Sequence, residues 1–168
     1  LDLSMWITDL WEPTKVSAKV YSKFGSPIKD YHYVSMWAGP PKEDGVFDVD
    51  DYAAGFVRFG KKATMSFEVA WACNAEDEVS VEFLGDKGGI KFCPGKPAVI
   101  RTEMDAKLAD ITLNYAKDDE QFPRQLAMFA DAVRGKGTVP ATGEQGLVAM
   151  RLLDAIYRSS EADCEVEV

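Results

Sequence analysis

A run of short segments in which apolar and polar residues alternate limits the fold more than any other feature of this chain. The alternation covers residues 51–59, 63–71 and 79–83, and it continues in a shorter segment at 90–93. A period of two residues is typical of a strand with one buried face, because successive side chains point to opposite faces. Turns of only a few residues separate the segments. We therefore predict an antiparallel meander rather than a parallel βαβ array.

Weaker alternation extends this predicted sheet on both sides. Residues 16–21 alternate in the same way, with Val16, Ala18 and Val20 on one face. Shorter strands are expected at 98–103 and 110–113, and an edge strand is expected at 164–168.

Three segments have helical spacing instead. Residues 1–11, before Pro13, place Leu3, Trp6, Ile7 and Leu10 on one helical face. A second helix starts near Phe122 and ends at Gly135. Thr142 followed three residues later by Gln145 predicts a capping box, which opens a helix that runs to about residue 162.

These elements predict an α+β fold, in which one open, mostly antiparallel sheet carries helices on one face. The length of 168 residues fits a single domain over 1–168, and the 46% of hydrophobic residues is enough to form a core. The other face of the sheet would then need a partner. We expect a sheet-to-sheet homodimer or a higher homo-oligomer.

Composition excludes several classes of function. The net charge of −9 argues against binding to nucleic acid and to anionic membranes, both of which attract basic surfaces. No apolar run is long enough for a membrane span. The 3 cysteines form no C-x-x-C pair, and a single histidine leaves no zinc-ligand set. Reduced thiols and a cytoplasmic protein are the expectation.

Few residues point to chemistry of their own. The chain has no glycine-rich phosphate-binding motif after a strand. His32 lies in an irregular stretch, 22–46, where it is either a general base or, more simply, a solvated loop histidine. Asp48, Asp50 and Asp51 either bind a hard cation or lie in a solvated turn. The turn is expected, because the spaced oxygen ligands and the glycine turn of a Ca²⁺ loop are missing. The polar residues 74–77, directly after Trp71, form either one wall of a ligand cleft or an ordinary hairpin loop.

The whole residue string resembles the C-terminal domain of the Gfo/Idh/MocA family of NAD(P)-dependent oxidoreductases. The matching stretches are LDLSMWITDLWEPTKVSAKVYSKFG, FDVDDYAAGFVRFGKKATMSFEVAWA, VEFLGDKGGIKF and FPRQLAMFADAVRGKGTVPATGEQGLVAMRLLDAIYRSS, in the family's order. The resemblance implies a two-domain enzyme, in which an N-terminal Rossmann domain, absent from this chain, binds NAD or NADP. It also implies that the present domain shapes the substrate pocket and forms the oligomer.

The resemblance implies no catalytic residue within this chain. The family's Lys, Asp and His are expected upstream of Leu1 when Asp2 is aligned with the Asp that follows the catalytic His. In a rival alignment Asp2 is the catalytic Asp, and Trp6 occupies the position of the His. The loop after the E-V-A-W-A strand borders the substrate in relatives, which implies substrate-binding roles for Trp71, Asn74 and Asp77, with His32 as a weaker candidate.

We therefore expect the substrate-binding and dimerisation domain of a dehydrogenase for a sugar, polyol or related hydroxy compound, inactive alone. The alternative is a non-catalytic binding or scaffold protein that uses the same dimerising sheet.

Overall fold

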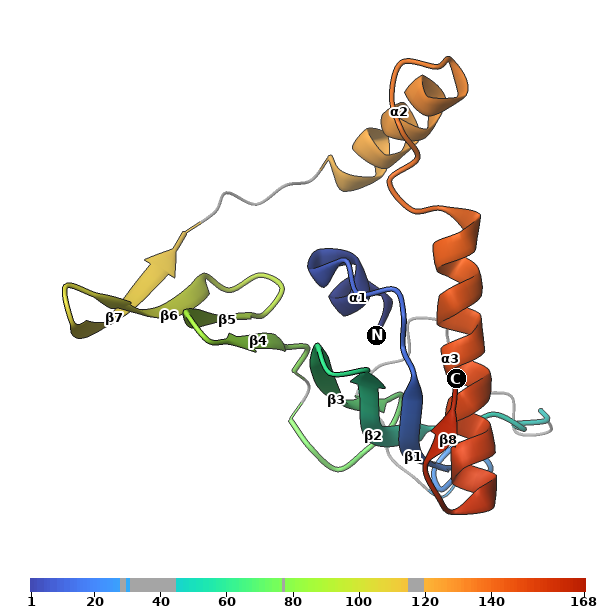
Figure 1. Cartoon of the computed structure of the whole chain (residues 1–168). Helices are drawn as coiled ribbons and strands as arrows, with labels where there is room; N and C mark the ends of the chain where they lie inside the picture. Colours follow the sequence, from blue (N-terminus) through green and yellow to red (C-terminus); the bar gives the residue numbers. More distant parts are fainter. Residues whose placement is uncertain (28–29, 31–44, 77, 115–119) are drawn as a thin grey trace. The chain divides into compact units, whose positions relative to one another are not determined.

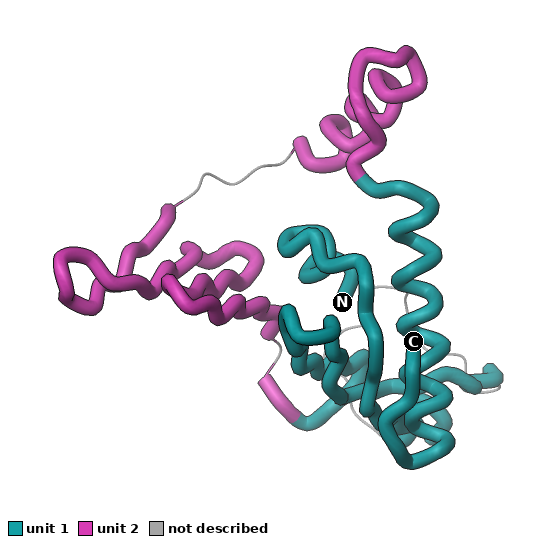
Figure 2. Tube along the Cα trace, in the orientation of Figure 1, with its two compact units in different colours: residues 1–74, 141–168 teal, residues 75–140 magenta. Residues whose placement is uncertain are grey.

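A computed structural model describes residues 1–27, 30, 45–76, 78–114 and 120–168. The chain forms two compact units, which Figure 2 distinguishes by colour. Unit 1 contains residues 1–74 and 141–168, and unit 2 contains residues 75–140.

Unit 1 is built on a four-stranded antiparallel sheet, here called sheet A, with the strand order β3-β2-β1-β8 (Figure 1). Val16 lies opposite Val57, and Val57 lies opposite Met65, so the three side chains share one face, the inner face. Ser17, Phe56 and Ser66 share the outer face in the same way. The strands are β1 (Lys15–Tyr21), β2 (Tyr52–Phe59), β3 (Ala63–Ala70) and β8 (Val166–Glu167).

Two helices cover the inner face of sheet A. They are α1 (Asp2–Thr8) and α3 (Gly143–Ala162). The core joins Met5 of α1 and Leu152 and Ile156 of α3 to Val16 and Val57 of the sheet. Each of these five side chains is at most 3% exposed. Burial of this kind contributes roughly 1.5–3 kcal/mol for each large apolar side chain.

The start of α3 and the orientation of α1 can be compared with the sequence predictions. Thr142 forms the predicted capping box, because its hydroxyl accepts the Gln145 N–H and the Gln145 side chain accepts the Thr142 N–H. The first helix does not bury Leu3 and Trp6, two of the apolar residues that the sequence analysis places on one of its faces. Leu3 and Trp6 are about half exposed, whereas Met5 is 1% exposed. The helix is only 7 residues long, and packing of Met5 into the core decides its orientation.

Beyond β8, two helix side chains cover the edge of β1. β8 pairs only with Lys15 and Val16. Farther along β1, the backbone N–H groups of Ala18 and Val20 donate to the hydroxyls of Ser159 and Ser160. Serines of α3 thus take the place of a neighbouring strand, which leaves fewer open hydrogen-bonding groups on this edge.

Unit 2 contains a four-stranded meander, sheet B, and one helix. Its strands follow chain order: β4 (Val81–Gly85), β5 (Gly88–Phe92), β6 (Ala98–Met104) and β7 (Lys107–Leu113). The helix is α2 (Gln121–Val133). One face of sheet B is apolar, since Phe83 lies opposite Ile90 and Ile90 opposite Ile100. The other face carries charges, where Arg101 lies 3.5 Å from Glu82 and 3.9 Å from Asp110.

The antiparallel sheets and the three helices confirm the α+β prediction. The strands divide over two sheets, however, where the sequence analysis expected one. Nothing within residues 71–80 forms a strand in the described part of this segment, so β3 and β4 are not hairpin neighbours. In the described ranges, no helix combines the length and apolarity that crossing a bilayer requires.

Candidate functional site

Three segments of unit 1 meet at one end of sheet A. Tyr21, at the end of β1, lies opposite Tyr52 at the start of β2, and Tyr52 lies opposite Ala70 at the end of β3. The chain therefore leaves β1, enters β2 and leaves β3 at the same place. We call residues 22–25, 47–51 and 71–74, which follow or precede these strand ends, the sheet-end cluster.

Asp51 holds the cluster together and is 1% exposed. One carboxylate oxygen, Oδ2, accepts hydrogen bonds from the backbone N–H groups of Lys23 (2.7 Å), Phe24 (2.5 Å) and Gly25 (3.1 Å). The expected solvated turn is therefore wrong for Asp51, since consecutive N–H groups compensate for its burial. Burial opposes ionisation, but these hydrogen bonds outweigh it and keep the pKa below the ordinary value of 3.8.

Trp71 and Asn74, two of the predicted substrate-binding residues, both lie in the cluster. The indole of Trp71 is 50% exposed, and it packs on the ring of Phe47 with 5.3 Å between centroids and 44° between planes. Asn74 is exposed three residues later. A half-exposed aromatic plane contacts the C–H face of a sugar, and an amide both donates to and accepts from hydroxyls. The pair offers the chemistry that binding of a polyhydroxyl compound needs.

The other two predicted site residues, His32 and Asp77, lie outside the described residues. Neighbouring carboxylates of the cluster are accounted for by local contacts. Asp50 accepts a hydrogen bond from the Tyr157 hydroxyl, which raises the pKa of Tyr157. Glu68 accepts one from Tyr52 and raises the pKa of that phenol.

The described ranges contain no group of three or more His, Cys, Asp or Glu side chains placed to hold a metal ion. In the sheet-end cluster the carboxylate of Asp51 is occupied by backbone donors, while Trp71 and Asn74 are exposed.

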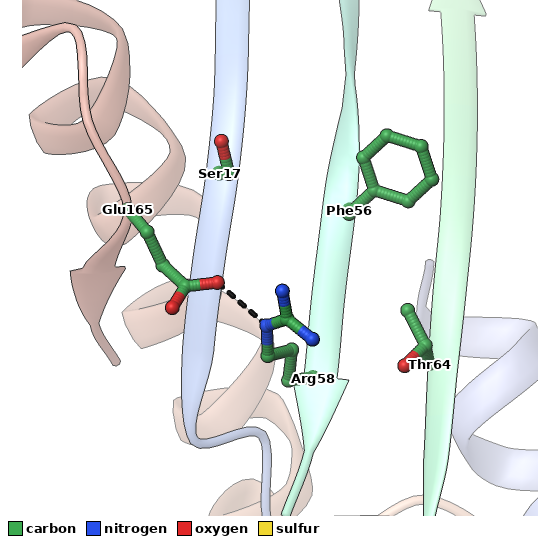
Figure 3. A pocket seen from close by; sticks show the side chains of 5 residues that line it. All are labelled: Ser17, Phe56, Arg58, Thr64 and Glu165. Carbon is green, nitrogen blue, oxygen red and sulfur yellow. Dashed lines mark hydrogen bonds and ion pairs between the residues drawn. The ribbon is translucent and has the colours of Figure 1, made fainter.

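A second feature is a shallow hollow on the outer face of sheet A (Figure 3). Ser17, Phe56, Arg58, Thr64 and Glu165 line it. Arg58 Nε lies 2.6 Å from Glu165 Oε2, and Lys15 lies 3.9 Å from the other oxygen of the same carboxylate. The hydrogen bond from Arg58 lowers the pKa of Glu165. Glu165 is therefore ionised and paired near neutral pH, which suits contact with a partner better than proton transfer.

Comparison with known proteins decides the family. Residues 15–168 match the model of the Gfo/Idh/MocA oxidoreductase family, C-terminal α/β domain. This stretch covers all of unit 2, unit 1 from Lys15 onward, and all described strands of both sheets. The chain belongs to this family.

Several proteins similar to the chain are oxidoreductases whose names refer to sugars. The chain is 26% identical over 170 residues to D-glucoside 3-dehydrogenase of Escherichia coli K12, and it covers 46% of that protein. The fold matches aldose-aldose oxidoreductase of Caulobacter crescentus, complexed with glycerol, at a TM-score of 0.70 and 19% identity, over 99% of the chain and 44% of the enzyme. The fold also matches levoglucosan dehydrogenase, complexed with NADH and levoglucosan, at a TM-score of 0.68 and 18% identity. This match covers 94% of the chain and 45% of the dehydrogenase.

The chain therefore spans about half the length of the relatives that it matches. In these oxidoreductases the domain described here accounts for one part of a longer protein. The complexes with NADH and with levoglucosan are properties of the relative, and the likeness at this identity establishes the shared fold.

Trp71 and Asn74 stay predictions from the sequence, but the sequence analysis does not indicate the contacts of Trp71 with Asp51 and Phe47. It expects Asp51 in a solvated turn, and it does not single out Phe47. Gly25 carried the available signal, because a side chain there would overlap the Phe47 ring. A glycine in a loop indicates a position where another group approaches the backbone closely.

Proposed function

We propose that this domain is the substrate-binding side of an NAD(P)-dependent dehydrogenase that oxidises a hydroxyl group of a sugar, polyol or related compound. The observation that carries the proposal is the exposed Trp71 side chain, followed three residues later by the exposed Asn74, at the end of sheet A. Similar members of the family are a D-glucoside dehydrogenase and a levoglucosan dehydrogenase. The exposed thiols of Cys73 and Cys164 support a cytoplasmic protein.

The described residues do not fit a nicotinamide nucleotide. All strand pairs among them are antiparallel, and no glycine-rich turn leads from a strand into a helix. We infer that a part of the complete protein outside this chain holds the nucleotide, which takes up a hydride. The catalytic Lys, Asp and His, among them the base that accepts the hydroxyl proton, are expected in that part as well. The residues of this chain bind the sugar, orient its reacting carbon and exclude water.

The test is a dehydrogenase assay on the complete protein. Methyl glucosides, free aldoses and polyols are supplied with NAD⁺ or NADP⁺, and formation of reduced nicotinamide is followed by absorbance. We expect turnover with at least one glucoside or aldose. A folded protein that binds the nucleotide but oxidises none of these compounds would contradict the proposal.

We also propose that the outer face of sheet A contacts a second copy of this chain. Phe56 at 59% exposure lies beside the Arg58–Glu165 pair, so an apolar centre is flanked by charges of both signs. Two antiparallel copies related by a two-fold axis would bring unlike charges together. Phe56→Asp should reduce the mass measured by sedimentation to that of the monomer, and Lys61→Asp in the β2–β3 turn should not. A wild-type protein that is monomeric at micromolar concentration would refute the contact.

A scaffold protein without catalysis is the second candidate, and the alignment that puts Trp6 at the histidine position favours it. The residues that precede Leu1 in the complete protein distinguish the two. An Asp-x-x-x-His ending there, preceded by a glycine-rich dinucleotide motif, indicates the enzyme. Its absence indicates the scaffold.

A further inference from the structure

The buried carboxylate of Asp51 connects two segments that leave sheet A from different strands. Its side chain holds the turn after β1, through the N–H groups of Lys23, Phe24 and Gly25. Its backbone carbonyl accepts hydrogen bonds from the N–H groups of Trp71 (2.8 Å) and Ala72 (3.4 Å), directly after β3. One residue therefore fixes both sides of the sheet-end cluster.

The two sides also meet through aromatic packing. Phe47 occupies the space over Gly25 that a Cβ atom would need. The same ring lies 5.3 Å from the ring of Trp71, and the two planes are inclined by 44°. The conformation of residues 23–25 thus determines where Phe47 rests, and Phe47 supports one side of the indole.

These contacts form an uninterrupted path from a charge to a binding surface. The carboxylate fixes the backbone at residues 23–25, this backbone supports Phe47, and Phe47 supports Trp71. The other carboxylate oxygen, Oδ1, is buried and has no hydrogen-bond partner among the described residues. A buried polar atom of this kind is costly, which indicates that the carboxylate serves more than local stability.

We propose that Asp51 is a positioning residue, which sets the orientation of the Trp71 indole through the turn at residues 23–25 and the ring of Phe47. The consequence for sugar binding rests on the proposed function of Trp71. The effect of Asp51 on the position of the indole is independent of that function.

The experiment uses the complete protein labelled with fluorotryptophan and observed by fluorine NMR. The resonance of residue 71 is identified as the line that disappears in Trp71→Phe. In Asp51→Ala this line should shift or broaden, because the support at residues 23–25 is lost. Gly25→Ala should produce a similar change through Phe47 without touching the carboxylate. Asp48→Ala, a change of an exposed carboxylate in the same segment, is the matched control and should leave the line in place.

Asp51→Asn covers the case in which the alanine variant fails to fold. The amide keeps one oxygen that accepts from the backbone donors, so a smaller change of the Trp71 line is expected than with alanine. A folded Asp51→Ala or Asp51→Asn protein whose Trp71 line stays at the wild-type position would overturn the proposal. Shared displacement of the line in Asp51→Ala and Gly25→Ala would support it.

Kinetics separate this proposal from the proposed function. If Trp71 contacts the sugar, Asp51→Ala should raise the sugar KM about tenfold, which corresponds to roughly 1.4 kcal/mol of binding, and leave the nucleotide KM unchanged. A displaced Trp71 line combined with an unchanged sugar KM in both Asp51→Ala and Trp71→Ala supports the positioning role of Asp51 and refutes the sugar contact.

Discussion

Replacing Ser159 by alanine tests how α3 closes the edge of sheet A. Ser159 is 1% exposed, and its hydroxyl makes two hydrogen bonds at once. It accepts the Ala18 N–H at 2.9 Å and donates to the Cys164 carbonyl at 2.7 Å. Alanine removes one oxygen atom and leaves both backbone groups without this partner, while the surrounding apolar packing stays the same.

The magnitude follows from what each group loses. The Ala18 N–H is partly buried, and a donor left unsatisfied there costs about 1–3 kcal/mol. Cys164 is exposed, so water can replace the hydroxyl at its carbonyl at little cost. Alanine regains about 0.5 kcal/mol as a better helix former. The expected net loss is about 1.5 kcal/mol, which corresponds to a decrease in Tm of about 4–5 °C for a chain of this length.

Urea unfolding followed by circular dichroism measures this loss, and amide hydrogen exchange shows where it acts. The Ala18 amide should exchange faster in Ser159→Ala, because its acceptor is gone. Glu161→Ala, at an exposed position of the same helix, is the control and should change stability by less than about 0.5 kcal/mol. A Ser159→Ala protein as stable as the wild type, with unchanged Ala18 exchange, would refute the edge-closing role of α3.

Three further changes test other parts of the structure. The pKa of Asp51 is lowered in the folded state, so its ionised carboxylate stabilises the fold at pH values above the ordinary pKa of 3.8. This contribution is lost as the pH falls through the folded-state pKa. Urea unfolding at several pH values should therefore show that the stability difference between wild type and Asp51→Asn shrinks below about pH 4. Gly55→Ala places a Cβ atom 2.5 Å from the Ser17 carbonyl oxygen and should destabilise by about 1–3 kcal/mol in the same assay, whereas Gly143→Ala meets nothing within 4 Å and should be neutral. Thr142→Ala removes the capping box and should cost about 1 kcal/mol, and a loss of helicity confined to α3 is the expected signature.

Local patterns predicted most of the elements of this fold. The alternation at residues 63–71 predicted β3, because Met65 and Phe67 both pack against the core from one face of this strand. Thr142 and Gln145 gave the start of α3, because a capping box satisfies backbone donors within four residues of sequence. Even the edge strand near the C-terminus was found, and β8 pairs with β1 there.

Features that depend on long-range contacts were not predicted. Nothing near Asp51 in the sequence shows that its carboxylate meets the N–H groups of residues 23–25, more than twenty positions earlier. The orientation of α1 depends on how Met5 fits between sheet and helix, which periodicity in a single turn or two does not determine. The division into two sheets likewise depends on which strands pair. In the candidate site, Trp71 and Asn74 were predicted from a family resemblance. The contacts of Trp71 with Asp51 and Phe47 were not predicted.

The most direct test of the account compares sugar and nucleotide kinetics in the complete protein after a change at Asn74, an exposed residue. We predict that Asn74→Ala raises the KM for the sugar about tenfold, which corresponds to the loss of roughly 1.4 kcal/mol of binding, and leaves the KM for NAD⁺ or NADP⁺ unchanged. Lys61→Ala, at the turn on the opposite end of β2 and β3, should alter neither constant. A rise in the nucleotide KM with an unchanged sugar KM would contradict the claim that this domain forms the sugar-binding side of the enzyme.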